Sequence, residues 1–147
     1  MKKLFIYYSL TGNGDLVAAE MEKKGYDIRR VELKKDMPKK FFFRIMTGGF
    51  LAGIKNRAAL RDYDSDVTEY DEIVVGSPVW NGRLTPAANS VLARTDLSGK
   101  TVSFILTAGG GTAPKAEERI AKEFPGSRVV ILKEPKKYAE ELSKLDP

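Results

Sequence analysis

Small hydroxyl and glycine residues follow the first apolar run of the chain and suit phosphate binding. Residues 4–8 read LFIYY, and Ser9-Leu10-Thr11-Gly12-Asn13-Gly14 comes next, before a helical pattern. Backbone amides at the start of a helix can receive an anion, and glycines let the backbone approach it closely. Ser9 and Thr11 add hydroxyl donors. The loop therefore predicts a phosphate site, and because no lysine follows Gly14 it is not a GxxxxGK loop.

Two further loops carry residues that suit a flat ligand. Gly76-Ser77-Pro78-Val79-Trp80-Asn81-Gly82 holds the only tryptophan of the chain beside a turn-prone Asn-Gly pair. Thr107-Ala108-Gly109-Gly110-Gly111-Thr112 holds three consecutive glycines, whose ordering has a high conformational entropy cost. The tryptophan either stacks on a ligand ring or caps the core, and the glycines either approach a ligand or form a flexible loop. Together the three loops suit a molecule with a phosphate tail and a flat head.

Strands that alternate with helices must position these loops. Apolar runs predict strands at 2–8, 27–33, 71–77, 101–107 and 128–132. Helical patterns occupy 15–24 and the segments that begin at Thr85-Pro86, at Pro114 and near Tyr138. This alternation predicts an α/β fold with a doubly wound parallel sheet, in which ligands bind beyond the carboxyl ends of the strands. Residues 36–66 interrupt the alternation as an insertion in a single domain that spans 1–147.

Composition narrows the chemistry. The 147 residues include no histidine and no cysteine, which excludes imidazole acid–base chemistry, thiol catalysis, disulfides and metal sites built on either residue. An enzyme of this composition would rely on a bound cofactor. We expect a cytoplasmic protein, because no signal peptide or membrane span is evident. The net charge of +5 is typical of ordinary solubility and otherwise suits an acidic partner or surface, and no nucleic-acid-binding module is evident in the sequence.

The three loops resemble those of the flavodoxin-like family, which binds flavin mononucleotide (FMN). The family's phosphate loop typically reads Ser/Thr-x-Thr-Gly-Asn-Thr, and one branch carries Gly-x-Pro-x-Trp-x-Gly in the second loop. The resemblance implies a five-stranded sheet in the order 2-1-3-4-5, with helices on both faces, and FMN as the cofactor. The cofactor-binding residues that it implies are Ser9, Leu10, Thr11, Gly12, Asn13, Gly14, Pro78, Val79, Trp80, Asn81, Gly82, Thr107, Ala108, Gly109, Gly110 and Gly111. It implies no catalytic residue and no metal.

Gly12-x-Gly14 also starts a dinucleotide fingerprint, and Glu32 lies near the position of a ribose-binding acid. The third glycine position is the bulky Val17, however, and the two hydroxyls suit a terminal phosphate better than a pyrophosphate. The FMN interpretation is therefore preferred. Gly14 replaces the family's final threonine, and Asp15 brings a carboxylate close to the phosphate. We accordingly expect weaker FMN binding than is typical, and tighter binding by the Gly14→Thr variant.

Two redox functions fit this sequence. A flavodoxin-like electron carrier is favoured, because no acid or base is obvious at the loops, and its redox partner should present an acidic face. The alternative is an FMN-dependent reductase that takes hydride from NAD(P)H and passes it to a quinone or related acceptor. A quinone-coupled oxidase of protoporphyrinogen and a binding module without FMN are less favoured.

The insertion leaves three roles open. Phe43, Met46, Phe50 and Ile54 fall on one helical face. That face is expected to cover the sheet or the flavin edge. It otherwise serves as a lid or docking surface, and contact with a membrane surface is the least expected role.

Overall fold

Parallel strands form the sheet that the alternating pattern predicts. The computed structural model describes residues 1–34 and 57–146. The parallel strands are β1 (Lys3–Tyr7), β2 (Asp27–Arg30), β3 (Glu72–Trp80), β5 (Thr101–Ala108) and β6 (Arg128–Lys133), in the order β2-β1-β3-β5-β6. The short strand β4 (Arg83–Leu84) pairs antiparallel with β3. Without β4, this order is the predicted 2-1-3-4-5 arrangement, so the doubly wound α/β fold is confirmed.

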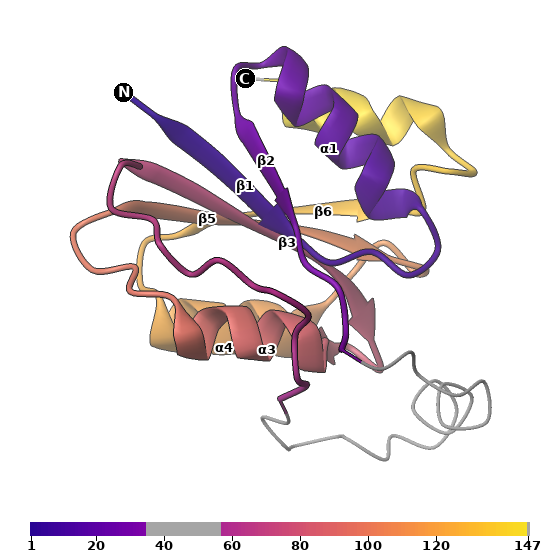
Figure 1. Ribbon diagram of the computed structural model, residues 1–147. Helices are drawn as coiled ribbons and strands as arrows, with labels where there is room; N and C mark the ends of the chain where they lie inside the picture. The colour runs from indigo at the N-terminus through magenta and orange to yellow at the C-terminus, as the bar shows by residue number, and fades with distance from the viewer. Residues whose placement is uncertain (35–56, 147) are drawn as a thin grey trace.

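Helices cover both faces of the sheet (Figure 1). Helix α1 (Asn13–Lys23) and the 3-10 helix η1 (Ala139–Leu145) lie on one face, and α3 (Pro86–Arg94) and α4 (Pro114–Glu123) lie on the other. The predicted start of α3 is confirmed, because Oγ1 of Thr85 accepts a hydrogen bond from the amide of Ala88. The final segment forms a 3-10 helix, whereas the sequence predicts an α-helix there.

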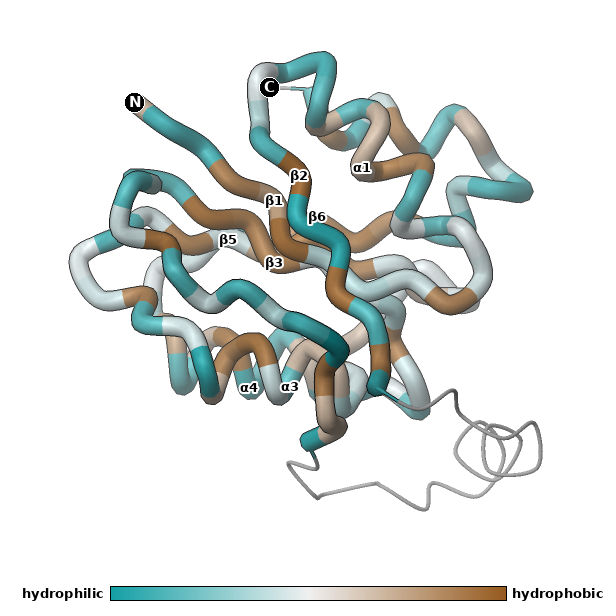
Figure 2. Tube along the Cα trace, in the orientation of Figure 1, coloured by the Kyte–Doolittle hydropathy of each residue, from teal (hydrophilic) through white to brown (hydrophobic). Residues whose placement is uncertain are grey.

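Alternate side chains of each strand supply the two halves of the core. In β1 and the residue after it, Leu4, Ile6 and Tyr8 point to the face of α3 and α4, and Phe5 and Tyr7 point to the face of α1. Figure 2 shows the resulting hydrophobic strands between the two helical layers. This burial fixes the register of the sheet and therefore the positions of the loops at its carboxyl edge.

Two strands have boundaries that the sequence does not predict. Strand β2 ends at Arg30, because the chain beyond Val31 leaves the sheet and Leu33 instead pairs antiparallel with Leu60. Strand β3 continues past Ser77 to Trp80, because β4 folds back on it as a hairpin. The second predicted ligand loop is therefore a strand end followed by a tight turn.

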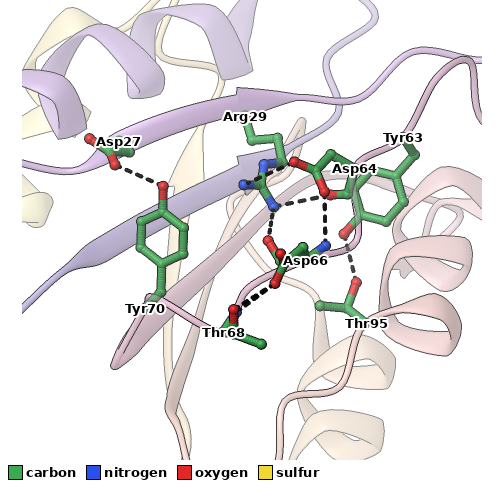
Figure 3. A network of polar contacts seen from close by, with 8 residues as sticks. All are labelled: Asp27, Arg29, Tyr63, Asp64, Asp66, Thr68, Tyr70 and Thr95. Carbon is green, nitrogen blue, oxygen red and sulfur yellow. Dashed lines mark hydrogen bonds and ion pairs between the residues drawn. The ribbon is translucent and has the colours of Figure 1, made fainter.

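The chain that returns from the insertion is fastened to β2 by Arg29 (Figure 3). Its Nη1 atom donates hydrogen bonds to the carbonyl oxygens of Asp64 and Asp66, at 3.0 and 2.9 Å. Beyond this point, the hydroxyl of Tyr70 donates to Oδ2 of Asp27 at 2.8 Å. These contacts hold the segment that precedes β3 against β2. The expected helical face at Phe43, Met46, Phe50 and Ile54 lies outside the described residues.

Candidate functional site

The loops after β1, β3 and β5 lie at one edge of the sheet, because these strands are parallel neighbours (Figure 1). Strand order reverses at β1, since β2 lies on one side of it and β3 on the other. The carboxyl edge at such a switch point is where open α/β sheets bind ligands. The structure therefore brings the three predicted loops together at the position where a ligand is expected.

A serine hydroxyl gathers the amides of the predicted phosphate loop. Oγ of the buried Ser9 accepts hydrogen bonds from the amides of Gly12 and Gly14, each at 3.2 Å. Gly12 is the N-cap residue of α1 and has a φ of 95°, a conformation that favours glycine. Because glycine has no side chain, Gly12 provides no side-chain capping hydrogen bond to the first amides of α1. The loop thus wraps tightly at a helix N-terminus, where the helix dipole favours an anion.

Gly14 is required by close packing between α1 and the end of β1. A Cβ atom at this position would lie 2.9 Å from Cβ of Ser9 and 3.0 Å from Cδ2 of Tyr7. Neither neighbour is the free end of a flexible side chain, so a larger residue would displace the strand end or the helix. The replacement of the family's threonine by glycine is therefore a packing feature of this chain. The structure argues against tighter FMN binding by Gly14→Thr.

The carboxylate of Asp15 is engaged by two neighbouring side chains. The hydroxyl of Tyr7 donates a hydrogen bond to its Oδ1 atom at 2.6 Å, and Nη1 of Arg30 lies 3.4 Å from the same atom. Arg30 also donates through Nη2 to the carbonyl of Ser9 at 3.2 Å. Burial raises the pKa of the Tyr7 phenol, and the hydrogen bond to Asp15 raises it further. Arg30 therefore offsets the negative charge that Asp15 would otherwise present to a phosphate.

The hairpin of β3 and β4 forms the second loop. Asn81 and Gly82 connect Trp80 to Arg83 and have φ values of 52° and 76°, as a type I′ turn requires. The carbonyl of Gly82 accepts a hydrogen bond from the amide of Ala116, in the first turn of α4. The turn is thus held against the helix that follows the glycine loop, which places the second and third loops side by side.

Trp80 lies in the core of the molecule. Its side chain is 6% exposed, and its ring meets the ring of Tyr8 edge-on, with a centroid separation of 6.1 Å. In this structure Trp80 packs against the core beneath the site, which is one of the two roles that the sequence leaves open. Its stacking on a flavin stays a prediction. Pro78 and Val79, by comparison, are partly exposed.

The glycine loop begins buried and ends open. Thr107 and Ala108 are buried, whereas Gly109 and Gly110 are exposed, and a Cβ atom at either glycine would meet none of the described residues within 4 Å. Gly111 closes the loop with a φ of 77°, and its amide donates to the carbonyl of Ala108 at 3.1 Å. The loop therefore presents bare backbone at the ligand edge.

Arg83 is a candidate that the motifs do not include. It lies opposite Trp80 in the hairpin pairing, and its Nε atom is buried without a hydrogen-bond partner in the part of the chain that the structure describes. Buried donors are nearly always paired, because an unpaired one has a free energy cost of about 1–3 kcal/mol. An orphaned donor in this hairpin is consistent with a ligand acceptor. An arginine after an Asn-Gly turn gives no sequence signal of that role.

Lysines lie beside each of the three loops. The side chain of Lys136 passes 3.6 Å from a Cβ position on Gly12, and that of Lys115 lies at the same distance from a Cβ position on Gly82. Lys133 lies 3.5 Å from the corresponding position on Gly111. The carboxyl edge is thus positively charged and suits an anionic ligand. Within residues 1–34 and 57–146, no group of acidic side chains could hold a metal ion, and no helix is long and apolar enough to span a membrane.

A sequence model of the family described as NADPH-dependent FMN reductase matches residues 9–134. The chain therefore belongs to this family, whose fold is flavodoxin-like. Membership confirms both the family that the loops resemble and the predicted cofactor, FMN. It favours the reductase alternative over the electron carrier. A comparison with curated proteins found no match.

Solved structures of flavoproteins share the fold. A putative flavoprotein from Bacteroides eggerthii is 20% identical, with a TM-score of 0.74 over 97% of this chain and 96% of its own. A putative flavoprotein from Bacteroides uniformis is 23% identical, with a TM-score of 0.67 over 95% and 97%. A flavoprotein from Lactobacillus acidophilus, solved in complex with FMN, is 18% identical, with a TM-score of 0.64 over 95% and 97%. At these identities the similarity establishes the fold alone.

Proposed function

We propose that this protein binds FMN at the carboxyl edge of β1, β3 and β5 and acts as an FMN-dependent NAD(P)H reductase of quinones or related small acceptors. The observation that carries the proposal is the loop between β1 and α1. Its Gly12 and Gly14 amides converge on one serine oxygen at a helix N-terminus, and the loop opens the segment that matches the reductase family. The family supports the reaction, and the loop supports the place of binding.

The residues at this edge fit FMN in two respects. The Ser9–Gly14 loop gathers the amides of Gly12 and Gly14 around Oγ of Ser9, an oxygen that a phosphate oxygen would replace as their acceptor, and the charge of Asp15 is offset by Arg30. The buried Nε atom of Arg83 offers a donor to an acceptor atom of the ligand. We expect residues 78–82 and 107–111 to line the ring, with the exposed backbone of Gly109 and Gly110 at its edge.

FMN, when bound, supplies a ring that accepts a hydride from NAD(P)H and returns two electrons, with one proton from that hydride and one from solvent, to the acceptor. The protein's own residues bind and orient. The side chain of Lys115 lies beside the second loop, where its charge favours the phosphates of a dinucleotide. The open space beside Gly109 and Gly110 suits a second ring better than a closed loop would.

An electron carrier is the second candidate, and the same positive edge favours it. Lys115, Lys133 and Lys136 are exposed around the loops and would meet an acidic face of a redox partner. Electron transfer by such a carrier would slow as salt is added. A transfer rate independent of salt would remove the acidic partner from consideration.

The proposal is tested by steady-state turnover. Purified protein is supplied with FMN, NADPH and a soluble quinone, and NADPH consumption is followed with and without the protein. We expect consumption that requires protein, FMN and quinone together, and that saturates with NADPH. Protein that binds FMN but adds nothing to the background rate would favour the carrier. Protein that ignores FMN would exclude both functions.

A further inference from the structure

The predicted phosphate loop lacks a positive charge of its own. Residues 9–14 are all uncharged, and the next residue is Asp15. A phosphate monoester carries a charge of about −1.5 to −2 at neutral pH. Arg30 contacts the loop, but its guanidinium already pairs with Asp15 and the carbonyl of Ser9. A counter-charge must therefore come from elsewhere.

The segment after β6 places a lysine on this loop. Glu134 adopts a φ of 32°, and its carbonyl accepts hydrogen bonds from the amides of Lys137 and Tyr138, at 2.8 and 3.0 Å. Pro135 is buried within the resulting turn. The turn directs the chain back toward the N-terminus of α1, with Lys136 at its tip.

Lys136 is docked on the loop through both its backbone and its side chain. Its amide donates to Oδ1 of Asn13 at 2.9 Å, and its Nζ atom donates to the carbonyl of Thr11 at 3.0 Å. The alkyl chain lies along Gly12, where even a Cβ atom would touch it. Asn13, part of the family motif, thus connects the loop to a segment far away in the sequence. The ammonium group is thus held at Thr11, the residue before Gly12, whose amide belongs to the predicted phosphate loop.

The ammonium of Lys136 retains capacity for a ligand. It carries three donors, of which the carbonyl of Thr11 takes one. Among the described residues, the ion pairs of the lysines do not include Lys136, whereas its neighbour Lys137 pairs with Glu134 at 3.5 Å. Within residues 1–34 and 57–146, the Lys136 ammonium thus has donors without a partner beside the phosphate loop, whereas Lys137 is a matched cation that pairs with Glu134.

We propose that Lys136 supplies the positive charge that holds the phosphate of FMN, so that the site distinguishes FMN from riboflavin through a residue outside the loop. This inference rests on the proposed FMN binding. Lys136 lies beyond residue 134, where the match to the family model ends, so the match itself assigns it no role. The turn at Glu134 and Pro135 then completes the cofactor site from the C-terminal side.

The test compares FMN with riboflavin, which lacks the phosphate. Dissociation constants are measured by quenching of flavin fluorescence for wild-type protein and for the Lys136→Gln, Lys136→Arg and Lys137→Gln variants. We expect Lys136→Gln to weaken FMN binding about tenfold and to leave riboflavin binding unchanged, because it removes a hydrogen bond to a charged group. Lys136→Arg should retain most of the affinity, and Lys137→Gln should bind both flavins like wild type. The dependence of FMN binding on salt should also become weaker in Lys136→Gln.

Three outcomes would overturn the inference, and they differ in what they imply. If Lys136→Gln binds FMN like wild type, Lys136 plays no part in binding. If it weakens FMN and riboflavin equally, Lys136 only shapes the loop. In both cases the proposed function stands. If wild-type protein binds no FMN, the proposed function fails and the inference fails with it. Because Lys136 is exposed, the variants should fold, and the melting temperatures of the flavin-free proteins verify this.

Discussion

The hydroxyl of Tyr7 donates a 2.6 Å hydrogen bond to Asp15, which joins the last residue of β1 to the first turn of α1 across the phosphate loop. Arg30, at the end of β2, pairs with the same carboxylate oxygen. The two ends of the loop are therefore fixed to each other and to the neighbouring strand. This arrangement allows an acidic residue to follow a phosphate loop without repelling the phosphate.

Removal of Arg30 should weaken FMN binding only while Asp15 is charged. In Arg30→Gln the carboxylate loses its counter-charge, and we expect FMN affinity to fall about two- to fivefold, the scale of a partly exposed ion pair. Asp15→Asn alone should change affinity less than about twofold, and the double variant should return close to wild type. Titration calorimetry with FMN measures all four proteins. An equal loss from Arg30→Gln in both backgrounds would instead assign the effect to its hydrogen bond with Ser9.

Tyr7 should contribute to the loss of stability at alkaline pH. Its folded-state pKa is raised above the ordinary value of 10.0, chiefly by burial and then by its hydrogen bond to Asp15. The unfolded chain therefore loses the phenolic proton first, so this stabilisation is complete below pH 10.0 and declines as the pH rises further. Urea unfolding of wild type and Tyr7→Phe, at neutral pH and at about pH 11, should show a smaller alkaline decrease for the variant. An identical decrease in both proteins would contradict this role.

Gly14→Thr should weaken FMN binding, contrary to the expectation from the family pattern. The new Cβ would overlap with Ser9 and Tyr7, and the displacement should lower the free energy of unfolding by about 1–3 kcal/mol. Gly109→Ala is the matched control for stability alone, because its Cβ would meet none of the described residues within 4 Å, whereas its backbone is assigned to the ring edge. Denaturant unfolding of both variants and FMN titration of Gly14→Thr test the comparison. Tighter FMN binding by Gly14→Thr would restore the original expectation.

Arg83→Met should change stability and FMN affinity in opposite directions. It removes a buried donor that has no partner among residues 1–34 and 57–146, so the flavin-free protein should be as stable as wild type or up to about 1 kcal/mol more stable. FMN binding should weaken, because that donor is the one assigned to the ligand. Arg83→Lys keeps the charge but lacks Nε, and should not fully restore affinity. A variant that loses stability and binds FMN normally would give Arg83 a purely structural role.

The sequence predicts the sheet and its loops because these follow from local pattern. Apolar runs of strand length, the Thr85-Pro86 helix start and the alternation of strands and helices are sufficient for the doubly wound α/β sheet, whereas the 2-1-3-4-5 order comes from the resemblance of the loops to the flavodoxin-like family. Details that depend on packing are missed. Trp80 has the same sequence signal as a core residue and as a stacking platform, and only the structure shows that its ring packs against Tyr8.

The two residues added to the site depend on tertiary structure alone. The unpaired Nε atom of Arg83 is a property of its burial in the hairpin. Lys136 reaches Thr11 and Asn13 from the other end of the chain, through a turn in which Glu134 adopts an uncommon conformation. Neither position belongs to a motif, so pattern alone does not distinguish them from the other basic residues of a chain rich in lysine and arginine.

The most direct measurement is the colour of the FMN-loaded protein after NADPH is added without oxygen. We predict that the protein binds FMN, that NADPH bleaches the yellow absorption of the bound flavin at least as fast as steady-state turnover, and that a quinone restores the absorption. Bound FMN that stays yellow with excess NADPH, but bleaches with a chemical reductant, would contradict the reductase assignment and favour a carrier. Protein that is colourless after incubation with FMN and removal of the free flavin would contradict the proposed site itself.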